Sequence, residues 1–417
     1  MKSTYKFLVY VTYLFFISTG FLIVHINAKK ISNRKLQSAG ASLSGLDSSS
    51  NSNTFDVMNY GAIGDGKSDD TDAFASAWAA ACKEEGSTVL VPSGSTFLVN
   101  PIPFSCQSKI IFQLEGTIIA PQSPGAWSSK PLQWLDFTSV DGLIIQGKGV
   151  IDGQGSVWWN GGTMPSTKPT ALRVANSKTV TVTGITIQNS QQAHLKFDNC
   201  DGVQKFLKLQ FHPPEIVPTQ MGSIYRTPKM WLFSTHRLDV GDDCISIQTG
   251  CSGINIHDVK CGPSHGISIG GLGKGGTEAS VSDVTVRDSS VTDSLCGVRI
   301  KTWQGGSGSV QETTFSNIQV SGVQIPIVID QYYSDGGSST NKLSAVAISG
   351  ISYASVTGTY TKLPMSIACS DSTPCTHITL SDIELTSSFG NSADPFCWKV
   401  DGEVTKPTAA TTNCLQT

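Results

Sequence analysis

A short pattern of apolar and polar positions recurs along most of the chain. Its six positions read apolar, small polar, then Asp, Asn or Gly, then apolar, any residue, and apolar. From the second copy on, the pattern returns about every 25 to 35 residues, which is a spacing typical of solenoid proteins. The copies begin at Val182, Ile256, Val281, Phe315, Ile348 and Leu380.

This pattern predicts the fold class. Each copy holds two short strand signals around a residue type that favours a tight turn, and β-branched residues alternate within them. A β-sandwich also consists of short strands and regular turns, but it does not need a repeated register. We therefore expect an all-β chain folded as a parallel β-helix, with an inward apolar ladder and with stacked Asn and Ser side chains at one turn.

One amphipathic helix is predicted before the repeats. It covers Thr71 to Cys82, with Asp69 or Asp70 near its N-cap. Long amphipathic helices are absent from the rest of the sequence. We expect this short N-terminal helix to cap the open end of the apolar core, as terminal caps do in other solenoids.

The N-terminus has the features of a targeting segment. Lys2 and Lys6 precede an apolar run that ends at Val24, and Ala28 is a suitable cleavage residue. We expect residues 1–28 to be a signal peptide and the mature protein to be free of the membrane. Because the run is near the shortest length for a membrane span, a retained anchor is the alternative. Residues 29–54 are predicted to be a flexible linker or pro-segment, and residues 55–417 the folded domain.

Cysteine usage is that of an exported protein. All eleven cysteines follow the linker, and in an exported chain most should be paired. No cysteine spacing resembles a zinc site, and we expect no metal and no cofactor. Short separations suggest Cys82 with Cys106, Cys244 with Cys261, Cys369 with Cys375 and Cys397 with Cys414, leaving Cys200, Cys251 and Cys296.

The charge of the chain argues against one class of partner. The formal net charge is -3, and only 15% of the residues are charged. A nucleic-acid binder would usually present a basic field, so we expect no nucleic-acid partner. We expect a monomer.

Three clusters carry candidate chemistry, namely Gly241-Asp242-Asp243, the stretch around His265, and Arg299-Ile300-Lys301. Glycoside hydrolysis needs one protonated carboxyl group and one ionised carboxylate, and two adjacent acids raise each other's pKa. Asp242 and Asp243 reach one site only if the chain bends, which Gly241 allows. Arg299 and Lys301 share one face of a strand, and such a pair of cations suits a polyanionic sugar.

In order and spacing, these clusters resemble the Gly-Asp-Asp, Gly-His-Gly and Arg-Ile-Lys motifs of the plant polygalacturonases. The resemblance runs from Phe55 to about Cys397. It implies a right-handed, single-stranded parallel β-helix that is secreted to the plant cell wall. It also implies hydrolysis, endo-acting and with inversion, of α-1,4 galacturonosyl bonds in polygalacturonate or pectin. The implied roles are general acid for Asp242, part of the base for Asp243, tuning of the site for His265, substrate carboxylate binding for Arg299 and Lys301, and a sugar subsite for Tyr333.

The resemblance breaks down within residues 205–240. The family carries Asn-Thr-Asp one rung before Gly-Asp-Asp, and its Asp shares the water-activating role; this chain has no such motif there and also loses the strand pattern. One hypothesis is a shifted reading frame, because codons for Glu215 to Ile224 exist that read Asn-Thr-Asp-Gly when two bases are skipped. Met221-Gly222 forces that Gly whichever codons are used. As written, we expect reduced activity and a scrambled rung.

Three further expectations follow from the family pattern. Gly271 stands where the family usually has Ser, and we expect little effect from this difference. The missing motif favours a non-catalytic or vestigial pectin-binding homologue as an alternative function. A pectate lyase, which is a calcium-dependent β-helix, is a second alternative, but the sequence shows no cluster of acidic calcium ligands and so argues against it.

Overall fold

The computed structural model describes residues 53–417, apart from 108, 130, 160–163, 207–209, 213–220, 227–228, 235–236, 239, 335–340, 413 and 416–417. Between residues 204 and 237 it describes the backbone only. The predicted signal peptide (1–28) lies outside the described residues, and so does the predicted linker (29–54) up to residue 52. These two predictions therefore stay predictions.

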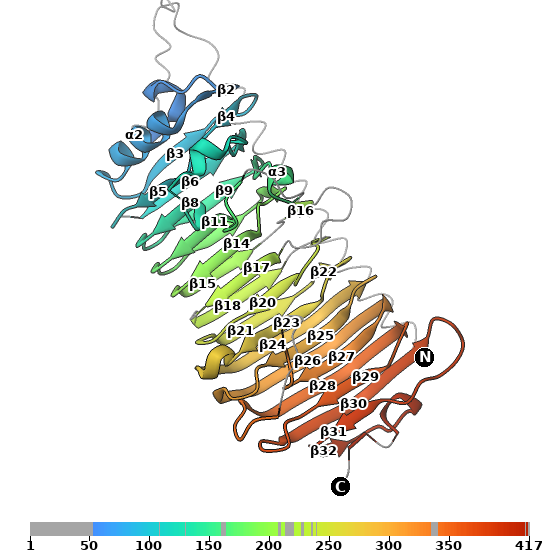
Figure 1. Ribbon diagram of the computed structural model, residues 1–417. Helices are drawn as coiled ribbons and strands as arrows, with labels where there is room; N and C mark the ends of the chain where they lie inside the picture. The colour runs from blue at the N-terminus through green and yellow to red at the C-terminus, as the bar shows by residue number, and fades with distance from the viewer. Residues whose placement is uncertain are drawn as a thin grey trace, which may run out of the picture. The chain divides into compact units, whose positions relative to one another are not determined.

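Of the three parallel sheets, two run along the domain and one covers its N-terminal part (Figure 1), and the chain winds through them as a right-handed parallel β-helix. The first sheet holds β1 (Thr54–Asp56), β3 (Ser87–Val91), β6 (Ile110–Leu114), β9 (Ile144–Gly147) and β12 (Thr181–Thr183). The third sheet holds, in spatial order, β31 (Phe396–Trp398), β29 (Met365–Ala368), β27 (Ile325–Asp330), β25 (Cys296–Thr302), β23 (Ile267–Leu272), β20 (Ile245–Ile247), β17 (Met221–Arg226), β14 (Ala193–Asp198), β11 (Thr170–Ala175), β8 (Gln133–Thr138) and β5 (Ile102–Ser105). We call this third sheet the site sheet, because it carries the candidate site.

The second sheet is the largest. Its path is β2 (Asp65–Asp69), β4 (Thr96–Leu98), β7 (Thr117–Ile119), β10 (Val150–Asp152), β13 (Thr186–Gln188), β16 (Gln210–His212), β19 (Arg237–Leu238), β22 (Lys260–Cys261), β24 (Glu278–Thr292), β26 (Ser307–Val323), β28 (Ala347–Tyr360), β30 (Cys375–Ser387) and β32 (Val400–Val404). It also includes β15 (Asp201–Phe206), β18 (Lys229–Ser234) and β21 (Ser252–His257). Because β21 and β22 both pair with β24, one long strand takes two positions in the later rungs.

The predicted inward ladder of apolar side chains is present. In the site sheet, Ile245, Ile267, Val298 and Ile327 stack in register, and each is 0–1% exposed. A second column of Ile247, Ile269, Ile300 and Ile329 lies two residues further on, because alternate side chains point to the same face. The other face of the site sheet is therefore free to carry polar and charged groups.

The predicted turns are present in the repeats, but at two different corners, because Val281 pairs with Val310 and Val310 with Ile348, whereas Phe315 pairs with Val286. The third residue of every copy has a positive φ, between 50° and 79°, which is the left-handed conformation that Gly, Asn and Asp adopt most readily. These residues are Gly184, Asp258, Asp283, Asn317, Gly350 and Asp382. Side chains stack at these corners too: the amide of Asn317 donates to Asp288 Oδ1 at 2.7 Å, and that of Asn199 donates to Asn176 Oδ1 at 2.9 Å.

The segment 205–240 keeps its place in the stack at the level of the backbone. Strand β17 pairs in parallel with β14 and β20, and β18 pairs with β15 and β21. The expected scrambling of this rung is therefore not seen in the described backbone, because ladder pairing uses peptide groups that every residue type except proline supplies in full. Its side chains lie outside the described residues, so the reading-frame hypothesis stays a prediction.

A helix lies at the N-terminal end of the sheets. Helix α2 spans Thr71–Ala81 with Asp70 at its N-cap, close to the predicted bounds. Its Phe74 and Trp78 are buried, with ring centroids 5.5 Å from Phe97 and 5.0 Å from Phe104. The other helical pieces are short: η1 (Val57–Tyr60), η2 (Pro124–Trp127), α3 (Ser156–Trp159), η3 (Lys274–Gly276) and η4 (Ala409–Thr411).

The four disulfides predicted from spacing are all formed: Cys82–Cys106, Cys244–Cys261, Cys369–Cys375 and Cys397–Cys414. Cys200, Cys251 and Cys296 are buried. Within the described part of the chain, no helix has both the length and the apolar character needed to cross a bilayer.

Candidate active site

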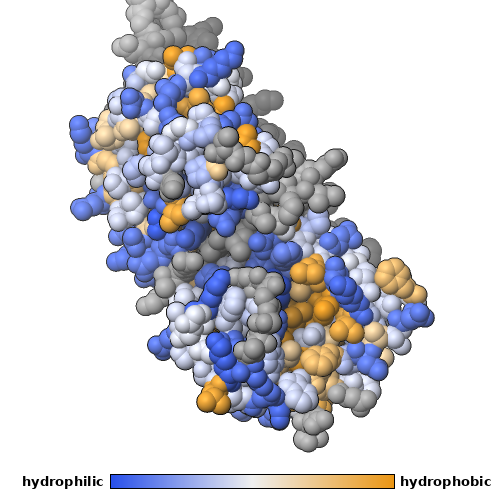
Figure 2. Space-filling view, in the orientation of Figure 1, coloured by the Kyte–Doolittle hydropathy of each residue, from blue (hydrophilic) through white to orange (hydrophobic). Residues whose placement is uncertain are grey.

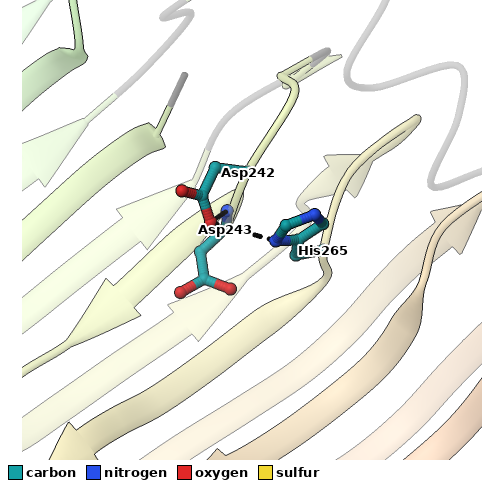
Figure 3. Close-up of side chains that lie close together, drawn as sticks. All are labelled: Asp242, Asp243 and His265. Atoms are coloured by element: carbon teal, nitrogen blue, oxygen red, sulfur yellow. Dashed lines mark hydrogen bonds and ion pairs between the residues drawn. The ribbon is translucent and has the colours of Figure 1, made fainter. Parts of the chain in front are cut away.

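The two adjacent acids lie in a bend, as the sequence predicted. Gly241 and Asp242 form this bend just before β20. It lets both carboxylates face one site instead of opposite sides of a strand. Ligand atoms of Asp242, Asp243 and His265 all lie within 4.8 Å of one another (Figure 3).

Asp242 is the more accessible acid, with 25% of its side chain exposed. Its Oδ1 lies 3.1 Å from Nδ1 of His265 and accepts the Asp243 backbone N–H at 2.7 Å. Burial raises the pKa of Asp242, but the hydrogen bond and charge of His265, with smaller contributions from nearby groups, outweigh burial. The net result is a pKa below the ordinary value. In the free protein Asp242 is therefore held in its ionised form.

Asp243 is fully buried and bound by two cations. Its Oδ1 accepts from Nη2 of Arg299 and its Oδ2 accepts from Nζ of Lys301, both at 2.7 Å. The Ser268 hydroxyl also donates to Oδ1 at 2.7 Å. Burial alone would lower the pKa of Arg299, but the charge of Asp243 raises it above its usual value.

This arrangement corrects one expectation from the sequence. The two acids were expected to raise each other's pKa, but the cations on Asp243 compensate its charge instead. One carboxylate against two cations leaves one positive charge in excess beside Asp242. Arg299 and Lys301 lie on one face, as predicted, but in this structure both contact Asp243. Their binding of a substrate carboxylate stays a prediction.

The spacing of the acids bears on stereochemistry. Inverting glycosidases hold their two carboxyl groups roughly 6.5–9.5 Å apart, and retaining enzymes roughly 5–5.5 Å. One ligand atom of Asp242 and one of Asp243 lie within 4.8 Å of each other, a limit on their nearest atoms and not the separation of the two carboxyl groups. Inversion with these two acids therefore stays a prediction.

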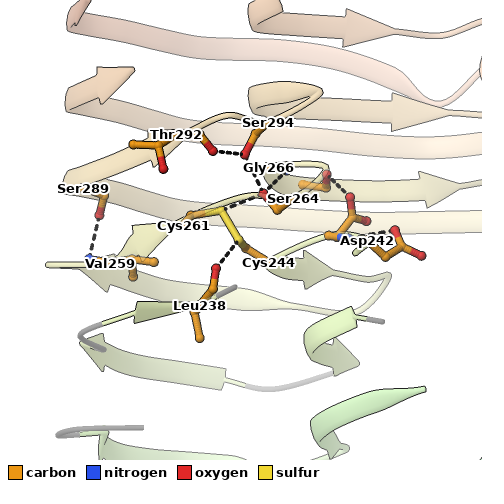
Figure 4. Close-up of a disulfide and its surroundings, with 12 residues drawn as sticks. Leu238, Asp242, Cys244, Val259, Cys261, Ser264, Gly266, Ser289, Thr292 and Ser294 are labelled. Carbon is orange, nitrogen blue, oxygen red and sulfur yellow. Dashed lines mark hydrogen bonds between the residues drawn. A yellow bond between two sulfur atoms is a disulfide. The ribbon is translucent and has the colours of Figure 1, made fainter. Parts of the chain in front are cut away.

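A disulfide holds the end of the bend, and a serine holds the turn that carries His265 (Figure 4). Cys244 and Cys261 join the end of the bend to the neighbouring strand. The Ser264 hydroxyl accepts the backbone N–H of Gly266 at 2.9 Å and lies 3.0 Å from the hydroxyl of Ser294. Ser264 stands where the family motif Gly-His-Gly has its first Gly, a difference that the sequence analysis passed over.

Two aromatic rings lie beside the cations. Trp303 and Tyr333 pack edge to face with centroids 5.6 Å apart, and Lys301 Nζ lies 5.2 Å from the Tyr333 centroid. A Cβ at Gly271 would come within 2.9 Å of both rings. The expectation that the identity of residue 271 has little effect is therefore wrong for this packing, because only glycine lets the rings lie this close.

Asp242, Asp243 and His265 have the donor types of a metal site. The carboxylate of Asp243 is already bound by Arg299 and Lys301, and both would repel a metal cation. Arg299 and Lys301 therefore disfavour a metal ion at this trio.

Comparison with known proteins identifies the family of this site. A family model described as glycosyl hydrolases family 28 matches residues 82–406. The chain belongs to this family. Among its relatives, a polygalacturonase of Chamaecyparis obtusa is 41% identical over 352 residues, covering 81% of this chain and 68% of that protein. A polygalacturonase of Malus domestica is 36% identical over 375 residues, covering 87% and 80%. The family 28 chain is thus a pectin-degrading polygalacturonase.

The solved structures support the fold. The endo-xylogalacturonan hydrolase of Aspergillus tubingensis superposes with a TM-score of 0.72 at 22% identity, covering 85% of this chain and 100% of that chain. The β-helix is therefore shared well beyond the range of close sequence similarity. This similarity concerns the fold and does not assign a role to any single residue.

Proposed function

We propose that this family 28 enzyme hydrolyses α-1,4 galacturonosyl bonds of homogalacturonan with inversion, with Asp242 as general acid and Asp243 as part of the base. The observation that carries the proposal is one accessible acid beside a buried acid that is bound by two cations. Arg299 and Lys301 are the groups that would hold a uronate carboxylate, and protonation of Asp242 leaves their two charges opposed by that of Asp243 alone. Tyr333, beside Lys301, lines the adjoining sugar position.

The lowered pKa of Asp242 in the free protein fits this role once substrate is considered. A general acid must be protonated, yet the free Asp242 is ionised. A bound uronate brings negative charge to Asp242 and excludes water from it, and both effects raise the pKa of a carboxyl group. We therefore propose that substrate binding raises the pKa of Asp242, so that Asp242 takes up the proton that it later donates.

The pH dependence of hydrolysis tests this assignment. The profile of kcat/KM reports pKa values of the free enzyme, and that of kcat reports those of the enzyme–substrate complex. We expect the pKa assigned to the acid to be higher in the kcat profile, and both limbs to vanish with the activity in Asp242→Asn. Equal pKa values in the two profiles would refute proton loading by the substrate. Anomeric NMR of the first product tests inversion.

The backbone register suggests where a third carboxylate would act. Ser223 pairs with Ile245, so position 221 lies one strand away from Asp243, at a spacing of about 4.8 Å. We propose that Met221→Asp raises the rate of reducing-end release above that of the chain as written. Met221→Asn is the matched control, because it is polar and of the same size but carries no charge. Equal rates for the two variants would remove position 221 from the mechanism.

We also propose that the enzyme acts in the plant cell wall after removal of residues 1–28, as a monomer and in endo mode. The charged and apolar N-terminal run and the four disulfides support export. N-terminal sequencing of protein recovered from the wall tests the cleavage. A fall in pectin viscosity that precedes substantial release of reducing ends tests endo action, and the mass in solution tests the monomer.

A further inference from the structure

The outer face of the site sheet continues well beyond the acids. Lys301 pairs in register with Asp330, Asp330 with Ala368, and Ala368 with Trp398. Arg299 pairs with Val328, Val328 with Ser366, and Ser366 with Phe396. Because residues in register share a face of the sheet, these two outward columns link the site to the last strand, β31.

The columns change character towards that strand. Ser366 and Ala368, on β29, have small side chains that project little from the outer face of the sheet. Phe396 and Trp398 then rise from β31, 49% and 47% exposed. Among the side chains that the structure describes, large exposed aromatics are uncommon, and most other large rings belong to the core. Figure 2 shows hydrophobic residues gathered over the C-terminal strands on the face that it presents.

The indole of Trp398 is held in one orientation by a hydrogen bond and contacts the ammonium group of Lys399. Its Nε1 donates to Oδ1 of Asp371 at 2.8 Å, and the Asp371 backbone N–H donates to the Tyr332 hydroxyl at 3.2 Å. The exposed Lys399 places its Nζ over the Trp398 ring, 5.6 Å from the ring centroid. Exposed aromatic rings with an ammonium group over one of them match a uronic acid, whose ring has an apolar face and whose carboxylate is negative.

We propose that Phe396, Trp398 and Lys399 form a distal subsite for a uronosyl unit of the same pectin chain that occupies the acids. Five strand spacings separate the register level of Asp243 from β31, or about 24 Å. The subsite therefore engages only chains long enough to cover that distance. It gives the enzyme a preference for polymer over short oligomers. The inference rests on the proposed function for the identity of the sugar.

The test compares binding of polygalacturonate with binding of trigalacturonate, whose three rings are too short to reach β31 from the acids. Calorimetry of the full-length protein gives Kd for both ligands. We expect Trp398→Ala to weaken polygalacturonate binding by about three- to tenfold, the equivalent of one aromatic stacking contact. Binding of trigalacturonate should be unchanged, and Trp398→Phe should retain most of the affinity for the polymer.

Phe389→Ala is the matched control, because Phe389 is 75% exposed but lies on the loop after β30, outside the two columns. Lys399→Gln, at an exposed position, tests the charge: we expect weaker polymer binding, with a loss that shrinks as salt is added. Equal losses for both ligands, or a loss in Phe389→Ala as large as that in Trp398→Ala, would overturn the subsite. Absence of product with intact, length-dependent binding would refute the proposed hydrolysis and leave the subsite standing.

Discussion

Replacing Asp243 by Asn isolates the energy stored in the buried charge cluster. The change keeps the size of the side chain but leaves Arg299 and Lys301, which are 8% and 4% exposed, facing a neutral amide. Removing one partner from a buried ion pair costs about 3–5 kcal/mol, because the remaining charge stays buried without compensation. Here two cations lose the same partner, so we expect a loss at the upper end of that range.

Urea unfolding with the disulfides intact measures this loss as a shift in midpoint. The matched control is Asp283→Asn, an exposed aspartate with positive φ that Asn also adopts, and it should stay within about 0.5 kcal/mol of the parent. In the Asp243→Asn background, Lys301→Met should recover part of the stability, because it removes one of the two uncompensated charges. A loss no larger than that of the control, or no recovery in the double variant, would refute the account of the cluster.

Three further outcomes are expected around the site. Gly271→Ser should displace the two aromatic rings beside it and raise KM for trigalacturonate several-fold with little change in kcat. The control is Gly125→Ser, where an added Cβ meets open space and should change neither constant. An unchanged KM in both variants would contradict the packing around Gly271. His265→Asn removes the hydrogen bond and charge that lower the pKa of Asp242, so the alkaline limb of kcat/KM, which reports the general acid, should move to higher pH. Acid unfolding of this variant should also move to higher pH. In the parent protein the lowered pKa of Asp242 stabilises the fold above the unfolded pKa of about 3.9, and this contribution is lost as pH falls through the folded pKa. Without His265 most of that contribution is missing from the start. Ser264→Ala should lower the unfolding free energy by about 1–3 kcal/mol, since it leaves a buried backbone N–H without its acceptor, and hydrogen exchange at the amide of residue 266 should report the loss.

The sequence predicted those features of the fold that local chemistry decides. Gly, Asn and Asp are favoured as the third residue of each repeat because the corners have a positive φ, and Asp283 and Asn317 show it. The four disulfides followed from short separations, since one rung brings such pairs together. The bend at Gly241 followed from the need to point two neighbouring acids to one side.

The partners of the site residues could not be predicted in the same way. Arg299 and Lys301 were placed on one face correctly, but their binding to Asp243 depends on the register between strands 56 and 58 residues apart. Loop lengths and core packing set that register, and no local pattern encodes it. The contacts around Gly271 likewise involve rings from other rungs, and the hydroxyl of Ser264 acts on a neighbouring peptide group. A reading of motif letters treated both positions as minor.

The outward columns of the site sheet have an evolutionary consequence. In a stack of rungs, whole turns can be gained or lost without altering the turns on either side, since each touches only its neighbours. A turn inserted between β25 and β31 would move the Phe396–Trp398 pair away from the acids by one strand spacing, about 4.8 Å, and leave the acids untouched. Chain-length preference in this architecture can therefore change in discrete steps, through duplication of a single coil, while the chemistry stays the same.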